Sequence, residues 1–174
     1  MDFLFFIEKD VFLKEEVLNK LNSLGISFKE IVHDAVYTIE QMDALGKDYF
    51  EGAKICKNLF LRDQKGKRHF LVVLPEEKRA PLDIIAEKIG STRLSFASNE
   101  RLMKYLKLEP GSVTPLSVIN DELNEVEVFI DEELRNENML GVHPCVNTAT
   151  VLIKPEDVEK FINSCGNKLK YINI

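Results

Sequence analysis

Side chains that could take part in catalysis gather in the segment from Gly141 to Val151, at the start of an apolar run. His143, Asn147 and Thr148 lie there, with Thr150 close behind. A histidine can act as a general base or as a hydrogen-bond donor near neutral pH, and the amide and hydroxyl groups can donate hydrogen bonds to oxygens of a substrate. Because the apolar run reads as a buried strand, these groups would stand on a rigid support. A structural histidine, and polar side chains that bind only their own turn, are the alternative explanation.

Cys145 lies two residues after His143 and invites comparison with thiol nucleophiles. Activation of a thiol needs a hydrogen bond in space that proximity in sequence does not provide. We therefore expect Cys145 to be a small buried side chain. The histidines and cysteines of the chain show no metal-ligand spacing, so neither a metal site nor a cofactor is predicted.

Two other segments carry candidate site residues. Lys57 stands near the start of an apolar run that reads as a strand, where its ammonium would be a fixed charge beside any cleft, or would simply lie in water. Gly111 and Pro115 bracket a short loop in which glycine allows unusual dihedral angles and proline fixes the exit. Such a loop can present backbone N–H groups to a substrate, although a plain connection between two elements has the same pattern.

The chain resembles the YbaK/ProX family of aminoacyl-tRNA deacylases, and most of all its freestanding ProX branch. The resemblance lies in these three segments, residues 57–61, 111–115 and 141–150, and in their order along the chain. The resemblance covers most of the chain. It implies that Lys57 lies in an editing pocket, where it pairs with the terminal phosphate of the tRNA or stabilises the carbonyl oxygen. It further implies that the loop containing Gly111 and Pro115 covers the aminoacyl group. His143 would shape the pocket and orient water, and Asn147 and Thr148 would contact the substrate.

The resemblance implies an enzyme that hydrolyses the ester joining alanine to the 3′-terminal adenosine of mischarged tRNA(Pro). A synthetase pocket for proline rejects the smaller alanine by only about 1–3 kcal/mol, so a second, smaller site is needed. Two alternatives stay open: hydrolysis of cysteinyl-tRNA(Pro), the activity of the YbaK branch, and a noncatalytic module that binds aminoacyl-tRNA or a synthetase. The implied partner is the acceptor end of tRNA(Pro), with prolyl-tRNA synthetase as a further candidate; no membrane and no DNA partner is expected.

Composition predicts one globular domain over residues 1–174, because the chain is 45% hydrophobic and 30% charged. The formal net charge is −6, yet residues 54–107 hold thirteen Lys and Arg against six Asp and Glu. This segment could bind a phosphate backbone, although charge alone, without the motifs, favours ordinary solvated surfaces. The N-terminus lacks the basic start and the cleavage site of a secretory signal, so we expect a cytoplasmic protein whose first residues pack on the body as a strand or a short helix.

The hydrophobic pattern predicts helices and strands in irregular alternation, which favours a mixed α+β fold over a doubly wound sheet. The resemblance adds a curved, partly barrel-like mixed sheet surrounded by helices. Helices are predicted at 14–24, from Thr38 to about Gly46, at 81–89, at 99–107 and at 155–165. Strands are predicted at 26–31, 53–61, 69–74, 93–97, 116–119, 126–130 and 148–153, with a hairpin turn at 63–67.

Overall fold

The computed structural model describes residues 3–35 and 47–174. The short helix predicted from Thr38 lies outside these residues. Within the described part of the chain, no helix is both long enough and apolar enough to span a membrane. The helices, with η for 3₁₀ helices, are α1 Phe3–Ser23, η1 Lys47–Phe50, α3 Leu82–Ile89, α4 Asn99–Leu106, η2 Pro115–Asn120, η3 Glu132–Asn136 and α5 Pro155–Cys165. The strands are β1 Lys29–Val32, β2 Lys54–Arg62, β3 His69–Pro75, β4 Ser95–Phe96, β5 Val126–Asp131, β6 Leu140–Val142, β7 Ala149–Ile153 and β8 Leu169–Ile172.

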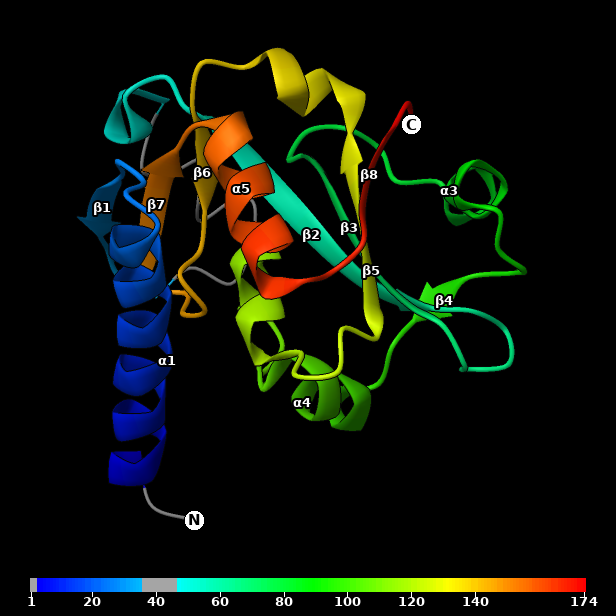
Figure 1. Ribbon diagram of the computed structural model, residues 1–174, viewed down its shortest axis with the longest axis horizontal. Coiled ribbons are helices and arrows are strands. Elements are labelled where there is room, and N and C mark those ends of the chain that lie inside the picture. Colours follow the sequence, from blue (N-terminus) through cyan, green and yellow to red (C-terminus); the bar gives the residue numbers. More distant parts are fainter. Residues whose placement is uncertain (1–2, 36–46) are drawn as a thin grey trace.

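The strands form one mixed sheet in the order β1-β7-β6-β2-β3-β5-β8, with β4 paired to β2 (Figure 1). β2 and β3 are the predicted antiparallel hairpin, joined through the turn at 63–67. The first residues of β2 also run parallel to β6, and its last residues pair with β4. β2 is therefore the strand that connects the two parts of the sheet, and the lysine-bearing segment of the sequence lies on it.

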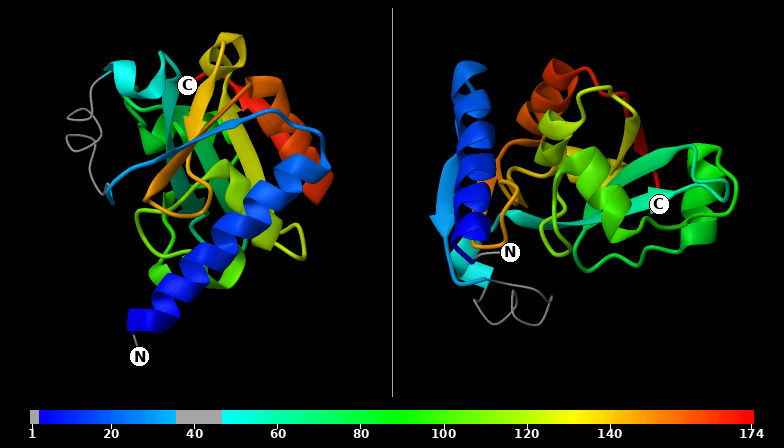
Figure 2. Two further views of the ribbon diagram at one scale, coloured as in Figure 1. Left: turned by 90° about the vertical axis from the view of Figure 1, so that its left-hand side faces the viewer. Right: turned by 90° about the horizontal axis from the view of Figure 1, so that it is seen from below.

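Helices cover both faces of the sheet, which explains why β3 is an uninterrupted apolar strand. Every residue of β3 is buried. Leu71 and Val73 belong to the main core with α1, α4, η2 and α5, whereas Phe70, Val72 and Leu74 pack on α3. In Figure 1 α5 crosses in front of β2, and α3 lies at the far right; Figure 2 shows α1 running past β1 at the opposite end of the sheet. A strand that is buried on both faces reads as continuous rather than alternating.

Local signals for helix ends were accurate. The hydroxyl of Ser98 accepts a hydrogen bond from the backbone N–H of Arg101 and caps α4. Gly90 adopts the left-handed conformation that ends α3, and Gly25, with φ of 66°, follows α1. α1 is longer than predicted because no glycine or proline separates Phe3 from the helical pattern further on, so the N-terminal residues extend that helix instead of forming an element of their own.

The strand predicted at 116–119 is wrong, because these residues form η2. Pro115 is the first residue of η2, and the hydroxyl of Thr114 accepts a hydrogen bond from the N–H of Leu116. A short buried apolar run does not by itself distinguish a strand from a helical turn. The strand predicted at 93–97 shortens to β4, and β1 begins only at Lys29, although Ile26 before it is buried. Strands β6 and β8 had not been predicted.

Candidate functional site

Two of the three candidate segments are neighbours in the sheet. β2 and β6 pair in parallel with Ile55 opposite Gly141. Gly141 is buried, and a Cβ added to it would stand 2.5 Å from Cδ1 of Ile55 and 3.3 Å from Cγ2 of Thr150. A side chain at position 141 would therefore force the end of the Ile55 side chain to move, and glycine lets β2, β6 and β7 approach one another without that shift. This close approach places the residues that follow Gly141 beside the strand that carries Lys57.

The third segment is tied to His143 by a short hydrogen bond. We call residues 107–114, between α4 and η2, the connector. The hydroxyl of Thr114, the last residue of the connector, donates to the carbonyl oxygen of His143 over 2.6 Å, and Thr114 is fully buried. The connector and the 141–150 segment thus hold each other in place. Thr114 was not singled out from the sequence, because its partner, the carbonyl oxygen of His143, lies 29 residues further along the chain.

His143 is held as a neutral imidazole. Its Nδ1 lies 3.1 Å from the carbonyl oxygen of Ala149. Since that oxygen can only accept, Nδ1 carries the proton, and in the neutral ring Nε2 then carries a lone pair. Burial lowers the pKa of His143 below its ordinary value, and the neighbouring His33 lowers it further, while the bond to Ala149 opposes the shift. Nε2 has no hydrogen-bond partner among the described residues.

His33, which the sequence analysis considered only for metal spacing, stands beside His143. It directly follows β1, is buried, and its ring centroid lies 6.5 Å from that of His143. Its Nε2 is 3.0 Å from the hydroxyl oxygen of Thr150, its Nδ1 is 2.8 Å from the carbonyl oxygen of Asp34, and Phe50 meets it edge-on. Nothing in the spacing of the histidines indicated this cluster, because it depends on the antiparallel pairing of β1 with β7.

Lys57 lies on the same face of β2 as Ile55, because side chains alternate along a strand. Its ammonium donates a hydrogen bond to the carbonyl oxygen of Lys78, in the connection between β3 and α3. Partial burial lowers the pKa of Lys57, and the acidic side chains of Glu76 and Glu77 oppose that shift. Within the described residues, Lys57 makes no hydrogen bond to His143 or to the connector. Its predicted role therefore requires the side chain to act as a charge at a distance or to turn toward the substrate.

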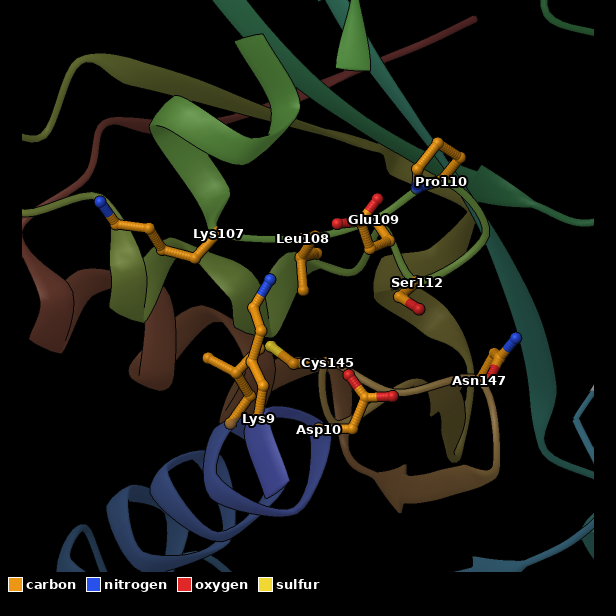
Figure 3. A pocket seen from close by; sticks show the side chains of 10 residues that line it. Lys9, Asp10, Lys107, Leu108, Glu109, Pro110, Ser112, Cys145 and Asn147 are labelled. Atoms are coloured by element: carbon orange, nitrogen blue, oxygen red, sulfur yellow. The ribbon is translucent and has the colours of Figure 1, made fainter. Parts of the chain in front are cut away.

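The connector borders a pocket of about 130 Å³ between α1 and the 141–150 segment (Figure 3). Figure 3 shows Asp10 of α1 below Ser112 of the connector, with Cys145 on one side of them and Asn147 on the other. The remaining lining residues are Lys9, Leu13, Lys107, Leu108, Glu109 and Pro110. Among the sequence-predicted residues, Asn147 is thus the one that lines this pocket, next to the residues that flank Gly111.

The other predicted residues are placed as follows. Gly111 is exposed and has φ of 93°, in the region that favours glycine. Pro115 is buried as the first residue of η2, so it can affect a substrate only by fixing the connector. The side chain of Thr148 is exposed. Cys145 is only 2% exposed and burial raises the pKa of its thiol, which confirms the prediction of a small buried side chain.

The basic stretch at 54–107 is partly neutralised within the fold. Lys54 forms an ion pair with Glu77, Arg68 with Glu127, and Lys78 with both Asp131 and Glu133. Other cations of this stretch, among them Lys65 and Lys67 in the hairpin turn, have no ion-pair partner within the described part of the chain. In the same part of the chain no three metal-ligating side chains gather at one place.

Comparison with known proteins gives these observations a context. Residues 33–161 match the family described as "Aminoacyl-tRNA editing domain". The chain is 46% identical over 165 residues to "Prolyl-tRNA editing protein ProX" of Acetoanaerobium sticklandii, a match that covers 95% of this chain and 99% of the relative. It is 31% identical over 159 residues to "Prolyl-tRNA synthetase associated domain-containing protein 1" of Mus musculus, covering 89% of this chain and 92% of the relative.

Solved structures confirm the predicted fold class. One that is described as a candidate trans-editing enzyme for prolyl tRNA synthetase superposes with a TM-score of 0.70 at 17% identity, over 93% of this chain and 97% of that one. At this identity the likeness concerns the fold alone. The mixed sheet with helices on both faces is thus shared with that structure, as the α+β prediction required.

Proposed function

This chain belongs to the aminoacyl-tRNA editing domain family, and from this premise we propose that it hydrolyses alanyl-tRNA(Pro), releasing alanine from the 3′-terminal adenosine. The observation that carries the proposal for this chain is the bond between Thr114 and the carbonyl oxygen of His143, which joins the connector to the histidine segment. A neutral histidine with a lone pair on Nε2 then stands beside a loop whose backbone can face a carbonyl group.

The reaction needs no covalent intermediate, because an aminoacyl ester is already activated toward water. A water molecule adds to the ester carbonyl carbon, and the bond from that carbon to the ribose oxygen breaks. The proton lost by the water is transferred to the departing ribose oxygen, which leaves as a hydroxyl group. We propose that Nε2 of His143 accepts a hydrogen bond from the attacking water and orients it. The ribose hydroxyl next to the ester can relay the proton to the leaving oxygen.

Stabilisation of the developing oxyanion is assigned to the connector. Backbone N–H groups around Gly111 can point toward the carbonyl oxygen, and the ammonium of Lys57 adds a positive charge on the neighbouring strand. Asn147 lines the same pocket as Ser112, and we assign it to binding of the aminoacyl or ribose oxygens. Thr148, with its exposed side chain, and Pro115, which fixes the connector, are proposed as substrate-binding and supporting residues respectively. The buried Cys145 has no part in this chemistry.

The finer assignments follow from the same premise. A tRNA is the substrate, and we propose that the acceptor end of tRNA(Pro) is the part that is recognised, with prolyl-tRNA synthetase as the protein that supplies the mischarged tRNA. We further propose that residues 1–174 act as a single editing domain and that the reaction takes place in the cytoplasm, where aminoacyl-tRNAs are consumed.

A panel of four substrates tests the proposal: alanyl-, cysteinyl-, seryl- and prolyl-tRNA(Pro), each incubated with a catalytic amount of purified protein. We expect rapid deacylation of the alanyl ester and survival of the prolyl ester. Faster turnover of the cysteinyl ester would replace alanine with cysteine as the substrate. If the protein binds the tRNAs but hydrolyses none of the four esters, even at stoichiometric concentration, the enzymatic assignment is overturned in favour of a binding module. Alanine attached to tRNA(Ala) serves as the control for tRNA selection.

A further inference from the structure

Thr148, which precedes β7, and the first two residues of β7, Ala149 and Thr150, each form a hydrogen bond with one of two histidines. The carbonyl oxygen of Thr148 accepts the backbone N–H of His33 over 3.0 Å. The carbonyl oxygen of Ala149 accepts Nδ1–H of His143 over 3.1 Å, and the hydroxyl of Thr150 meets Nε2 of His33 at 3.0 Å. The 148–150 segment is therefore fixed from β1 on one side and from the end of β6 on the other.

The direction of each hydrogen bond in this cluster follows from its partners. Nδ1 of His33 faces the carbonyl oxygen of Asp34, so it must donate. In the neutral ring Nε2 of His33 is then an acceptor, and the hydroxyl of Thr150 is its donor. Both side chains are enclosed, His33 with 8% and Thr150 with 1% of its surface exposed. The donor–acceptor order is consequently protected from exchange with bulk water.

We infer that His33 and Thr150 are positioning residues for His143: by fixing Thr148 and Thr150 on either side of Ala149, they hold the Ala149 carbonyl where it accepts Nδ1–H of His143. This contact selects the tautomer of His143 in which the lone pair lies on Nε2. The assignment of a catalytic consequence rests on the proposed function, whereas the selection of the tautomer does not.

Main-chain pairing alone does not account for these side chains. β1 and β7 are already joined by an antiparallel ladder from Lys29 opposite Leu152 to Val32 opposite Ala149. Phe50, Leu152 and Ile55 supply an apolar cluster on this side of the sheet, in which an apolar residue would pack at least as well as a histidine that needs two hydrogen bonds. The polar pair at His33 and Thr150 is therefore better explained by the orientation that it imposes on the 148–150 segment.

Three substitutions separate this role from simple packing. Thr150→Val keeps the shape and removes the hydroxyl, Thr150→Ser keeps the hydroxyl, and His33→Phe keeps an aromatic ring against Phe50 but removes both ring nitrogens. Val32→Ala, at the exposed last position of β1 and next to His33, is the matched control. Two-bond ¹H–¹⁵N correlation spectra of the histidine rings report the tautomer of His143 directly in the protein without tRNA.

We expect a single His143 tautomer, protonated at Nδ1, in the wild type, Thr150→Ser and Val32→Ala. In Thr150→Val and His33→Phe both tautomers should be populated. We expect kcat on alanyl-tRNA to fall about tenfold in these two variants, which is less than the 10²–10⁴-fold that a positioned acid–base group contributes. KM should stay within about twofold of the wild-type value. An unchanged His143 spectrum in these two variants, or a Thr150→Ser variant that behaves like Thr150→Val, overturns the inference.

The spectra also distinguish the positioning role of His33 and Thr150 from the proposed deacylase function. A wild-type protein that leaves every tRNA acylated contradicts the proposed function, while its histidine spectra still decide the positioning role. If Thr150→Val does not fold, as judged by circular dichroism, the spectrum of His33→Phe decides it, and the reverse holds if His33→Phe is the variant that fails.

Discussion

Gly141 and Ile55 face each other across the parallel pair of β6 and β2, and a Cβ on the glycine would stand 2.5 Å from Cδ1 of Ile55, so the isoleucine side chain would have to shift. The contact fixes the spacing of the two strands from which the candidate site is built. It therefore links packing in the sheet to the placement of His143, which lies two residues beyond Gly141.

The first prediction concerns this contact. Gly141→Ala should lower the free energy of unfolding by about 1–3 kcal/mol, the usual cost of overfilling a packed site. Ile55→Val removes the colliding methyl group, so the double variant should be more stable than the sum of the two single effects predicts. Urea denaturation of all four proteins measures this coupling. Strictly additive effects would show that Ile55 does not limit the space at Gly141.

A second prediction concerns the positive charge on β2. Lys57→Met retains the aliphatic stem and removes the ammonium, and we expect kcat/KM for alanyl-tRNA(Pro) to fall about 10²-fold, as for the loss of one group that stabilises an oxyanion. Lys65→Met, in the exposed hairpin turn, should stay within about twofold of the wild type and is the matched control. Equal activity of the wild type and Lys57→Met would remove Lys57 from the catalytic residues.

The third prediction concerns the bond that joins the connector to the histidine segment. Thr114→Val loses both the bond to the His143 carbonyl and the cap of η2, so the free energy of unfolding should fall by about 1–3 kcal/mol because a buried acceptor is left unpaired. Thr114→Ser should retain most of the stability and of the deacylase rate. Thermal unfolding and single-turnover deacylation check both expectations; a serine variant as impaired as the valine variant would speak against the hydroxyl.

The fourth prediction is the pH dependence of the activity. The pKa of His143 lies below its ordinary value of 6.5 mainly because the residue is buried. The imidazole is therefore mostly neutral at pH 7, and the midpoint of the acid-side decline in kcat/KM should lie below pH 6.5. Rates measured between pH 4.5 and 8, with the spontaneous hydrolysis of the ester subtracted, test this. A decline that is already centred above pH 6.5 would mean that another group controls the reaction.

The fifth prediction is the pH dependence of stability. Burial and the nearby Arg101 and Lys104 lower the pKa of His69 to about 4, whereas the unfolded chain titrates near 6.5. The unfolded state therefore binds the proton first, so this contribution to stability is complete above pH 6.5 and is lost as the pH falls toward 4. His69→Gln should flatten the corresponding part of a plot of the free energy of unfolding against pH. An identical slope in both proteins would exclude His69 as its source.

Elements with local end signals could be predicted from the sequence. Ser98 as a cap, Gly90 as a stop and the turn at 63–67 each act within a few residues, and α4, α3 and the β2–β3 hairpin were located accordingly. η2 was mistaken for a strand because its apolar residues are buried in either geometry. β6 and β8, of three and four residues, are too short to show a period and exist because neighbouring strands pair with them.

The candidate site shows the same difference between local signals, which the sequence contains, and contacts between distant residues, which it does not reveal. Lys57, Gly111, His143 and Asn147 were predicted as site residues from residue type and from the order of their segments. The contacts of His33 and Thr114 were not predicted, because each depends on a partner that lies far away in the sequence: Thr150 for His33, and the His143 carbonyl for Thr114. Such contacts leave no periodic trace in the chain, and only the fold shows them.

The pairing of β2 with β6 also bears on how the molecule folds. The β2–β3 hairpin closes over a turn of a few residues, whereas the contact between Ile55 and Gly141 must close a loop that contains α3, α4, η2 and β5. Closing a long loop costs more chain entropy and is slow, so contacts of large sequence separation tend to form late. A nascent chain leaving the ribosome would accordingly complete the hairpin early, and the candidate site would assemble only after β6 and β7 had also been synthesised.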